Sequence, residues 1–180
     1  MKKKLSHIIW FTGLSGTGKT TISNYLFQIL KKKKFKVLKI DGDKFRKKSK
    51  NQNKFTIKNI LKNNFKIIDY LKKKQRKYDF ILVSVISPLS KTRYFAKYVF
   101  KKNYHEAYVN CSFKTLIQRD TKGFYKKAIE KKMTNLIGFR SKIKYERSKY
   151  KVIKINTDKL SIHKSAQKVL KILKHEKKIF

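Results

Sequence analysis

The fold is decided by one stretch of eight residues, Gly13-Leu14-Ser15-Gly16-Thr17-Gly18-Lys19-Thr20. It satisfies the phosphate-binding loop pattern, which is glycine, any four residues, glycine, lysine, and then serine or threonine. The apolar run Ile8-Ile9-Trp10-Phe11 precedes it and is typical of a buried parallel strand. Residues 21–30 follow it with apolar side chains at the spacing of one helical face. Strand, glycine loop and helix occur in the required order, which favours this interpretation over a chance glycine turn.

The chemistry expected of this loop is the binding of ATP together with Mg²⁺. Glycines let backbone N–H groups turn inward around a triphosphate, and the amino end of the following helix adds its positive partial charge. Lys19 is expected to bridge the β- and γ-phosphates, and the Thr20 hydroxyl is expected to hold Mg²⁺.

The charge of the chain allows two hypotheses about its partners. Lys+Arg number 50 against 10 Asp+Glu, which gives a formal net charge of +40. Such a charge attracts polyanions, so the chain could be a nucleic-acid or anionic-membrane binder. The alternative is lysine enrichment over every solvated face, and the scattering of basic runs such as 31–34, 72–74 and 177–178 favours it. We therefore expect a small anionic substrate and no dedicated nucleic-acid site.

Length and cysteine content point to one cytoplasmic domain. The 180 residues suit a single domain, 1–180, with its own core. The single cysteine, Cys111, rules out an internal disulfide and fits a reducing compartment. The basic start Met1-Lys2-Lys3-Lys4 resembles a signal peptide, but His7 interrupts the apolar segment and no cleavage site follows, so we do not expect export. No stretch approaches the length needed to span a bilayer.

The rest of the chain alternates between strand and helix patterns. Apolar runs predict further strands at 36–40, 78–86, 106–109 and 152–155. Helical spacing predicts helices at 56–71, 90–101, 113–119 and 161–173, the last begun by Asp158 or Ser161. Residues 44–54 are expected to be a loop, and 121–150 a long mobile insertion. This alternation predicts an α/β fold with a five-stranded parallel sheet covered by helices on both faces.

Several segments carry a resemblance to a known family. In order, they are 10–20, Asp41-Gly42-Asp43 with Arg46, Ile86-Ser87-Pro88, 118–128, Tyr145-Glu146 and 156–161. Together they resemble the adenylylsulfate kinases, which phosphorylate the 3′-hydroxyl of adenosine 5′-phosphosulfate. The resemblance spans nearly the whole chain. It implies a P-loop kinase domain, a three-layer sandwich with a lid at approximately 121–150, and leaves a homodimer open.

The resemblance also implies roles for individual residues. Asp43 would orient the acceptor hydroxyl, with a helix or turn cap as the alternative, and Asp41 would join Thr20 at the metal. Ser87 corresponds to a serine regarded in parts of the family as a phosphorylated intermediate; direct in-line transfer needs no such step, so we place it in the substrate pocket. Residues expected to contact the acceptor are Arg46, Asn59, Ile86, Lys122 and Leu136. Residues expected over the nucleotide are Arg119, Lys126 and Thr157. Phe124 and Leu136 would flank the acceptor adenine or pack under the lid.

The departures from the family pattern concentrate on the acceptor side. Members normally have asparagine where Lys44 stands, and the loop that follows is shortened here. Two arginines are replaced by Leu61 and Lys62, an aromatic and an arginine by Leu89 and Ser90, and a threonine by Ile137. Another nucleotide-linked acceptor from a surface-polysaccharide pathway is therefore an alternative to adenosine 5′-phosphosulfate. A degenerate kinase fold that only binds polyanions is a second.

Overall fold

In the computed structural model, which describes residues 5–47 and 56–175, five parallel strands form one sheet in the order β2-β3-β1-β4-β5. They are β1 (His7–Thr12), β2 (Val37–Asp41), β3 (Phe80–Ser84), β4 (Tyr104–Asn110) and β5 (Ile153–Asn156). Strand β1 is central, and its Ile9 is in register with Leu82 on one side and His105 on the other. The predicted α/β class with a parallel five-stranded sheet is confirmed.

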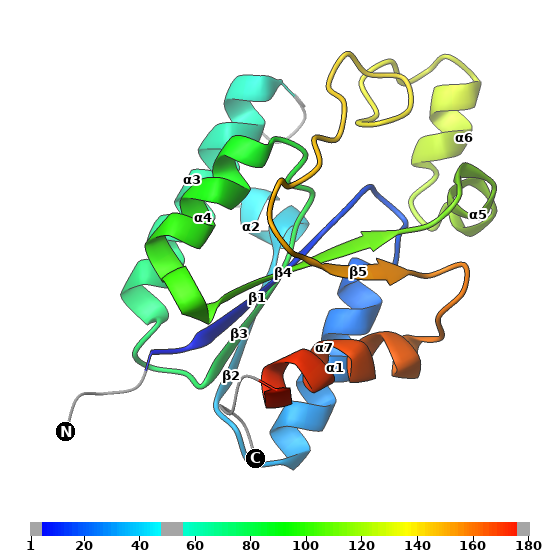
Figure 1. Cartoon of the computed structure of the whole chain (residues 1–180). Helices are drawn as coiled ribbons and strands as arrows, with labels where there is room; N and C mark the ends of the chain where they lie inside the picture. Colours follow the sequence, from blue (N-terminus) through cyan, green and yellow to red (C-terminus); the bar gives the residue numbers. More distant parts are fainter. Residues whose placement is uncertain (1–4, 48–55, 176–180) are drawn as a thin grey trace.

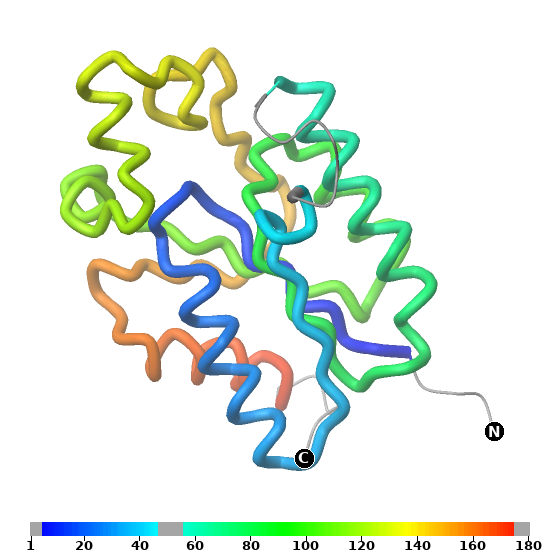
Figure 2. The backbone as a smooth tube through the Cα atoms, turned by 180° about the vertical axis from the view of Figure 1, so that it is seen from behind, coloured from blue at the N-terminus to red at the C-terminus, as the bar shows by residue number. Residues whose placement is uncertain are grey.

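Helices cover both faces of the sheet (Figure 1). They are α1 (Lys19–Lys32), α2 (Gly42–Lys47), α3 (Ile57–Lys74), α4 (Ser90–Phe100), α5 (Phe113–Arg119), α6 (Phe124–Ile129) and α7 (Ile162–His175), with a short 3₁₀ turn, η1 (Lys101–Asn103). Helices α1 and α7 lie on one face, and α3 and α4 lie on the other, as the view from behind in Figure 2 also shows. Among the described residues, no helix combines the length and the apolar character that a membrane crossing needs.

The two core layers follow from the alternation of side chains along β1. Ile9 and Phe11 enter the layer under α1 and α7, with Leu26 and Val169. Ile8 and Trp10 enter the opposite layer under α3 and α4. Because successive residues of a strand point to opposite faces, a strand buried on both sides must be apolar throughout. This is why the run before the phosphate loop is continuous rather than alternating.

The prediction of a loop at 44–54 is wrong for its first part. Residues 44–47 belong to α2, and 48–54 lie outside the described residues. The carboxylate of Asp41 accepts hydrogen bonds from the backbone N–H groups of Asp43, at 3.0 Å, and Lys44, at 3.2 Å. These bonds cap a helix that starts at Gly42, where basic composition had suggested irregular chain. The capping role considered for Asp43 thus belongs to Asp41.

Candidate active site

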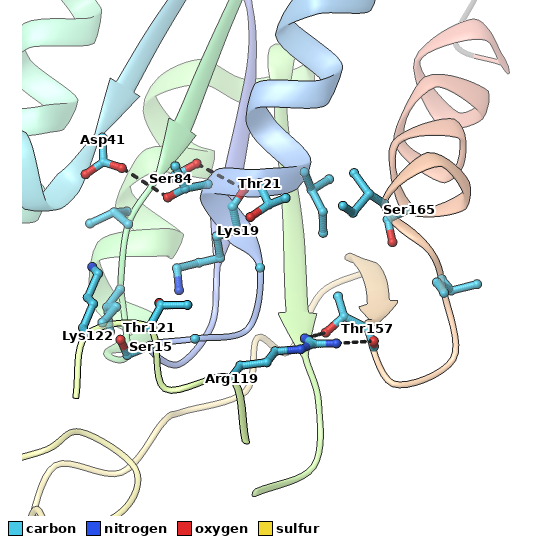
Figure 3. Close-up of a pocket in the computed structure, with 18 of the residues that line it drawn as sticks. Ser15, Lys19, Thr21, Asp41, Ser84, Arg119, Thr121, Lys122, Thr157 and Ser165 are labelled. Carbon is cyan, nitrogen blue, oxygen red and sulfur yellow. Dashed lines mark hydrogen bonds between the residues drawn. The ribbon is translucent and has the colours of Figure 1, made fainter. Parts of the chain in front are cut away.

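A cavity of about 740 Å³ opens at the carboxyl ends of the strands, and the phosphate loop forms its floor. In parallel α/β sheets this edge is where ligands bind. Figure 3 shows the cavity with Lys19 pointing into it from the start of α1, and with Arg119 and Thr157 on one side. Asp41, Asp43 and Lys122 lie on the other side. Residues far apart in sequence therefore meet at one site.

The backbone of the phosphate loop has a shape that only glycine tolerates at its first position. Gly13 has φ +143°, and a Cβ placed there would lie 2.0 Å from the Val109 carbonyl oxygen of β4. Any side chain would push the loop off the sheet. Within the loop, the Thr17 hydroxyl donates to the Leu14 carbonyl at 3.0 Å, which closes the turn. The loop is thus held in its curved form by β4 and by its own residues.

Lys19 is buried at the base of this loop, where it is only 8% exposed. Its ammonium group donates to the Leu14 carbonyl oxygen at 2.6 Å. Burial lowers the pKa of Lys19 to about 8, and the charges of Asp43 and Asp41 oppose that shift while Lys122 adds to it. A lysine poised in this way gains strongly from an anion beside it. It can hold a phosphate group of a nucleotide that lies on the loop.

Thr20 and Asp41, the residues expected at the metal, are brought together. The Thr20 hydroxyl donates to the second Asp41 carboxylate oxygen at 3.1 Å. Mg²⁺ prefers oxygen ligands and commonly takes one or two protein groups plus substrate phosphates and waters. A hydroxyl and a carboxylate beside a phosphate loop fit that preference. Their roles as Mg²⁺ ligands remain predictions.

Asp43 lies between two basic side chains at the mouth of the cavity. Arg46 contacts one of its carboxylate oxygens at 2.7 Å, and Lys122, between α5 and α6, contacts the other. Burial of the Asp43 carboxyl opposes ionisation, but the hydrogen bond and charge of Lys122, with Arg46 and Lys19, hold its pKa below the usual value. Asp43 is therefore a carboxylate at neutral pH, with both oxygens directed by fixed partners.

The opposite end of the cavity is built from α5 and the segment after β5. The Arg119 guanidinium donates to the Thr157 hydroxyl and to its carbonyl oxygen, both at 2.9 Å (Figure 3). The Thr157 hydroxyl in turn donates to the Thr17 carbonyl of the phosphate loop at 3.2 Å. Both residues expected at the nucleotide thus border the loop. The expected Lys126 does not, because it is exposed on the outer side of α6.

A small recess lies beside this cavity and shares Asp43 with it. The recess has a volume of about 20 Å³, and its lining includes four of the residues assigned to the catalytic centre or the acceptor. They are Asp43, Arg46, Asn59 and Ile86. Ile137, the residue in place of a threonine, also lines it. The structure therefore groups the four predicted residues in one place, although they come from α2, α3 and the segment after β3.

Besides Lys126, three residues expected at the acceptor are placed away from both spaces. Ser87 is fully buried, and its hydroxyl contacts the side chains of Asn64, at 3.1 Å, and Thr92, at 2.9 Å. Leu136 packs in an apolar cluster with Tyr125, and Phe124 borders that cluster. For Phe124 and Leu136 the packing alternative therefore describes their position in this structure.

The sequence interpretation missed a buried ion pair that anchors the end of the segment predicted as a lid, 121–150. Arg93 on α4 lies 3.3 Å from Glu106 on β4, and both side chains are almost inaccessible. Glu106 also accepts hydrogen bonds from Ser148 at 2.8 Å and from Tyr150 at 2.5 Å. Arg93 reaches the Glu146 carbonyl. A carboxylate inside a predicted buried strand needs a partner, so Glu106 was the signal that could have revealed this network.

The comparison with known proteins agrees with this geometry. The family model of adenylylsulphate kinase matches residues 5–156. The chain belongs to this family. It is 33% identical to the adenylyl-sulfate kinase of Halothermothrix orenii, over 98% of this chain and 94% of that one. It is also 32% identical to a cytidine diphosphoramidate kinase of Campylobacter jejuni, over 76% of this chain and 79% of the relative.

A solved structure extends the likeness to three dimensions. The Mycobacterium tuberculosis APS kinase in complex with AMPPNP and APS superposes with a TM-score of 0.85 at 27% identity, over 95% of this chain and 99% of that one. Members of the family are kinases, so this chain is a nucleotide-dependent phosphotransferase with a P-loop kinase fold. The family expected from the sequence is confirmed.

Proposed function

We propose that this chain transfers the γ-phosphoryl group of ATP to a sugar hydroxyl of a small nucleotide, in the presence of Mg²⁺. One observation carries this function: Asp43 lines both the phosphate-loop cavity and the neighbouring recess. A donor on the loop and an acceptor beside the recess would therefore meet at Asp43. Phosphoryl transfer needs positioning and charge neutralisation more than covalent participation by the protein, and these residues supply both.

In this reaction the acceptor hydroxyl oxygen forms a bond to the γ-phosphorus while the bond from that phosphorus to the β,γ-bridging oxygen breaks, which releases ADP. Asp43 accepts a hydrogen bond from the hydroxyl and so orients its lone pair toward phosphorus; the proton leaves to Asp43 or to solvent. Lys19 stabilises the charge on the β- and γ-phosphates. Thr20 and Asp41 would hold Mg²⁺, which neutralises phosphate charge when bound.

Arg119 and Thr157 would hold the donor nucleotide from the far side of the loop. The guanidinium of Arg119 is fixed by its two hydrogen bonds to Thr157, so it needs little reordering to meet an anionic ligand. We further propose a single cytoplasmic domain, 1–180, in which residues 121–150 act as the lid. Lys122 links this lid to Asp43, and closure there would exclude water from the reacting groups.

Adenosine 5′-phosphosulfate, phosphorylated on its 3′-hydroxyl, is the first candidate acceptor. It is favoured by the family match over residues 5–156 and by the grouping of Asp43, Arg46 and Asn59 around one recess. Lys122 adds a second cation beside Asp43. The donor is ATP because the whole phosphate-loop pattern is present.

Cytidine diphosphoramidate is the second candidate acceptor, and the changes on the acceptor side favour it. Leu61 and Lys62 stand where two arginines are usual, and lysine does not replace the planar fork of arginine toward an anion. The relative from Campylobacter jejuni is named for this substrate. Loss of two charge-assisted contacts would weaken binding of a sulfate by about a hundredfold or more.

The deciding experiment is ADP release from ATP and Mg²⁺ with each acceptor in turn, with AMP as a control. Turnover of either candidate that exceeds turnover of AMP, and that is lost in Lys19→Ala, supports the kinase function. If neither candidate is phosphorylated faster than AMP, the acceptor class is wrong. If binding of mixed RNA at physiological salt persists without ATP and no acceptor is phosphorylated, the polyanion-binding alternative replaces the kinase.

A further inference from the structure

The side chain of Asn64 is a buried acceptor-side group whose chemistry the proposed function does not use. It lies on α3, is 1% exposed, and borders the recess together with Asp43, Arg46 and Asn59. The family resemblance assigns it no role. A buried amide that borders a ligand recess is a candidate for substrate recognition, because each of its polar atoms needs a partner.

A chain of hydrogen bonds fixes the orientation of this amide. The Thr92 hydroxyl donates to the Leu89 carbonyl oxygen at 3.1 Å, so its oxygen is left to accept. The Ser87 hydroxyl, 2.9 Å away, therefore donates to Thr92. Ser87 has then used its only proton and must accept from Asn64, at 3.1 Å. The Asn64 Nδ2 atom thus faces Ser87, and its Oδ1 atom is the other end of the amide.

The Oδ1 atom of Asn64 is buried and, in the described part of the chain, has no hydrogen-bond partner. Leaving a buried amide oxygen unpaired is unfavourable, and native proteins rarely do so. The recess of about 20 Å³ has room for one water-sized group. The oxygen can only accept, so a group that pairs with it must carry an N–H or O–H.

We propose that Asn64 Oδ1 accepts a hydrogen bond from an amino group of the acceptor nucleotide, and so makes Asn64 a specificity-determining residue. This inference rests on the proposed kinase function. Sulfate and phosphate oxygens are themselves acceptors and gain nothing from Oδ1. An amino group is close to water in size and donates. The two candidate acceptors carry such a group in different places: the exocyclic amine of adenine or cytosine, and the terminal –NH₂ of a phosphoramidate.

Two matched pairs of acceptors distinguish these sources. Adenosine 5′-phosphosulfate and its inosine analogue differ at the base amine, and cytidine diphosphoramidate and cytidine diphosphate differ at the terminal group. For each member, kcat/KM is measured with ATP and Mg²⁺ for the native chain, for Asn64→Leu and for Asn63→Ala. Asn63→Ala alters the neighbouring α3 residue in the lining of the same recess and leaves the hydrogen-bond chain of Asn64 intact, so it controls for a merely structural effect.

We expect the native chain to prefer the amine-bearing member of one pair by about tenfold or more, mainly through KM, since a site built to pair with an N–H discriminates against its absence. Asn64→Leu should reduce that ratio to near one, and Asn63→Ala should preserve it. Asn64→Ala repeats the measurement if leucine disturbs folding. Equal turnover within both pairs, or a preference that survives in the Asn64 variants, would overturn this role and leave the kinase intact. Turnover of none of the four acceptors would overturn both.

Discussion

The two halves of the site are built in different ways. Within the cavity of about 740 Å³, the donor half rests on one continuous stretch, 13–20, and is completed by Arg119 and Thr157; the rest of the lining includes Asp41, Ile86 and Lys122. The acceptor half is a recess of about 20 Å³ whose lining comes from four separate parts of the chain. Asp43 belongs to both. A contiguous loop that binds phosphate through its backbone tolerates little change, whereas a recess made of side chains can be altered one residue at a time.

The largest effect on turnover should come from substitution of Lys19 in the donor half. In Lys19→Ala the charge next to the β- and γ-phosphates is lost, so kcat should fall by about 10²–10³, which is typical for removal of one electrostatic group. The loss should be the same with every acceptor. Steady-state ADP release measures it, and Lys154→Ala, which alters an exposed residue of β5, is the matched control. An acceptor-dependent loss would mean that the halves are not separable.

Substitution of Asp43, the residue that lines both halves, should lower the rate of phosphoryl transfer without weakening ATP binding. Asp43→Asn keeps the shape of the side chain but removes the charge that Arg46 and Lys122 surround. We expect kcat to fall by about a hundredfold, as for loss of a general base, while the Kd of ATP changes by less than about threefold. Turnover and isothermal titration report the two quantities. Weakened ATP binding with normal kcat would place Asp43 with the donor instead.

The donor half was largely readable from the sequence, because its residues are adjacent and their spacing is fixed by the backbone. The five strands were also readable, since a strand buried on both faces must be apolar, as 8–11 is. The first turn of α2 was not, because Asp41 caps it through contacts that composition does not reveal. Nor was the Arg93–Glu106 pair, which joins residues on two elements and depends on tertiary packing.

On the acceptor side, too, the sequence did not predict tertiary contacts, as the position of Ser87 shows. The motif that includes Ser87 was recognised, but its burial depends on Asn64 and Thr92, which lie on two different helices. Side-chain partners in a recess are chosen by the fold, and a local pattern contains little information about them. The burial of Asn64 could not be predicted from the sequence, because a polar residue within a basic helix is expected to be exposed.

Within the donor half, Arg119 and Lys126 should differ, although the sequence assigned both to the phosphates. Arg119 borders the cavity and is fixed by Thr157, whereas Lys126 faces away. Arg119→Ala should raise the KM of ATP by about tenfold, which corresponds to one charge-assisted contact. Lys126→Ala should leave it within about twofold. Equal increases in the two variants would indicate that α6 moves over the nucleotide during turnover.

An effect of similar size should appear in the pH dependence of ATP binding. The pKa of Lys19 is about 8 in the free protein because the group is buried. Bound phosphates favour the charged form and raise that pKa, so above about pH 8 binding must take up a proton. Affinity should therefore fall by about tenfold between pH 7 and pH 9. Calorimetry in buffers of different ionisation enthalpy should find uptake of about one proton at pH 9 in the native chain and none from this group in Lys19→Ala.

The smallest effect on turnover should come from Ser87→Ala. The Ser87 hydroxyl is fully buried, donates to Thr92 and accepts from Asn64. Both of its hydrogen bonds are therefore made within the protein interior. Its removal should leave kcat within about threefold and lower the free energy of unfolding by about 1–3 kcal/mol, since Asn64 Nδ2 loses its partner. Urea unfolding measures the second quantity. A phosphorylated intermediate on Ser87 would require the opposite pattern, in which kcat collapses and stability hardly changes, and mass spectrometry of the native chain stopped during turnover would detect the added phosphate.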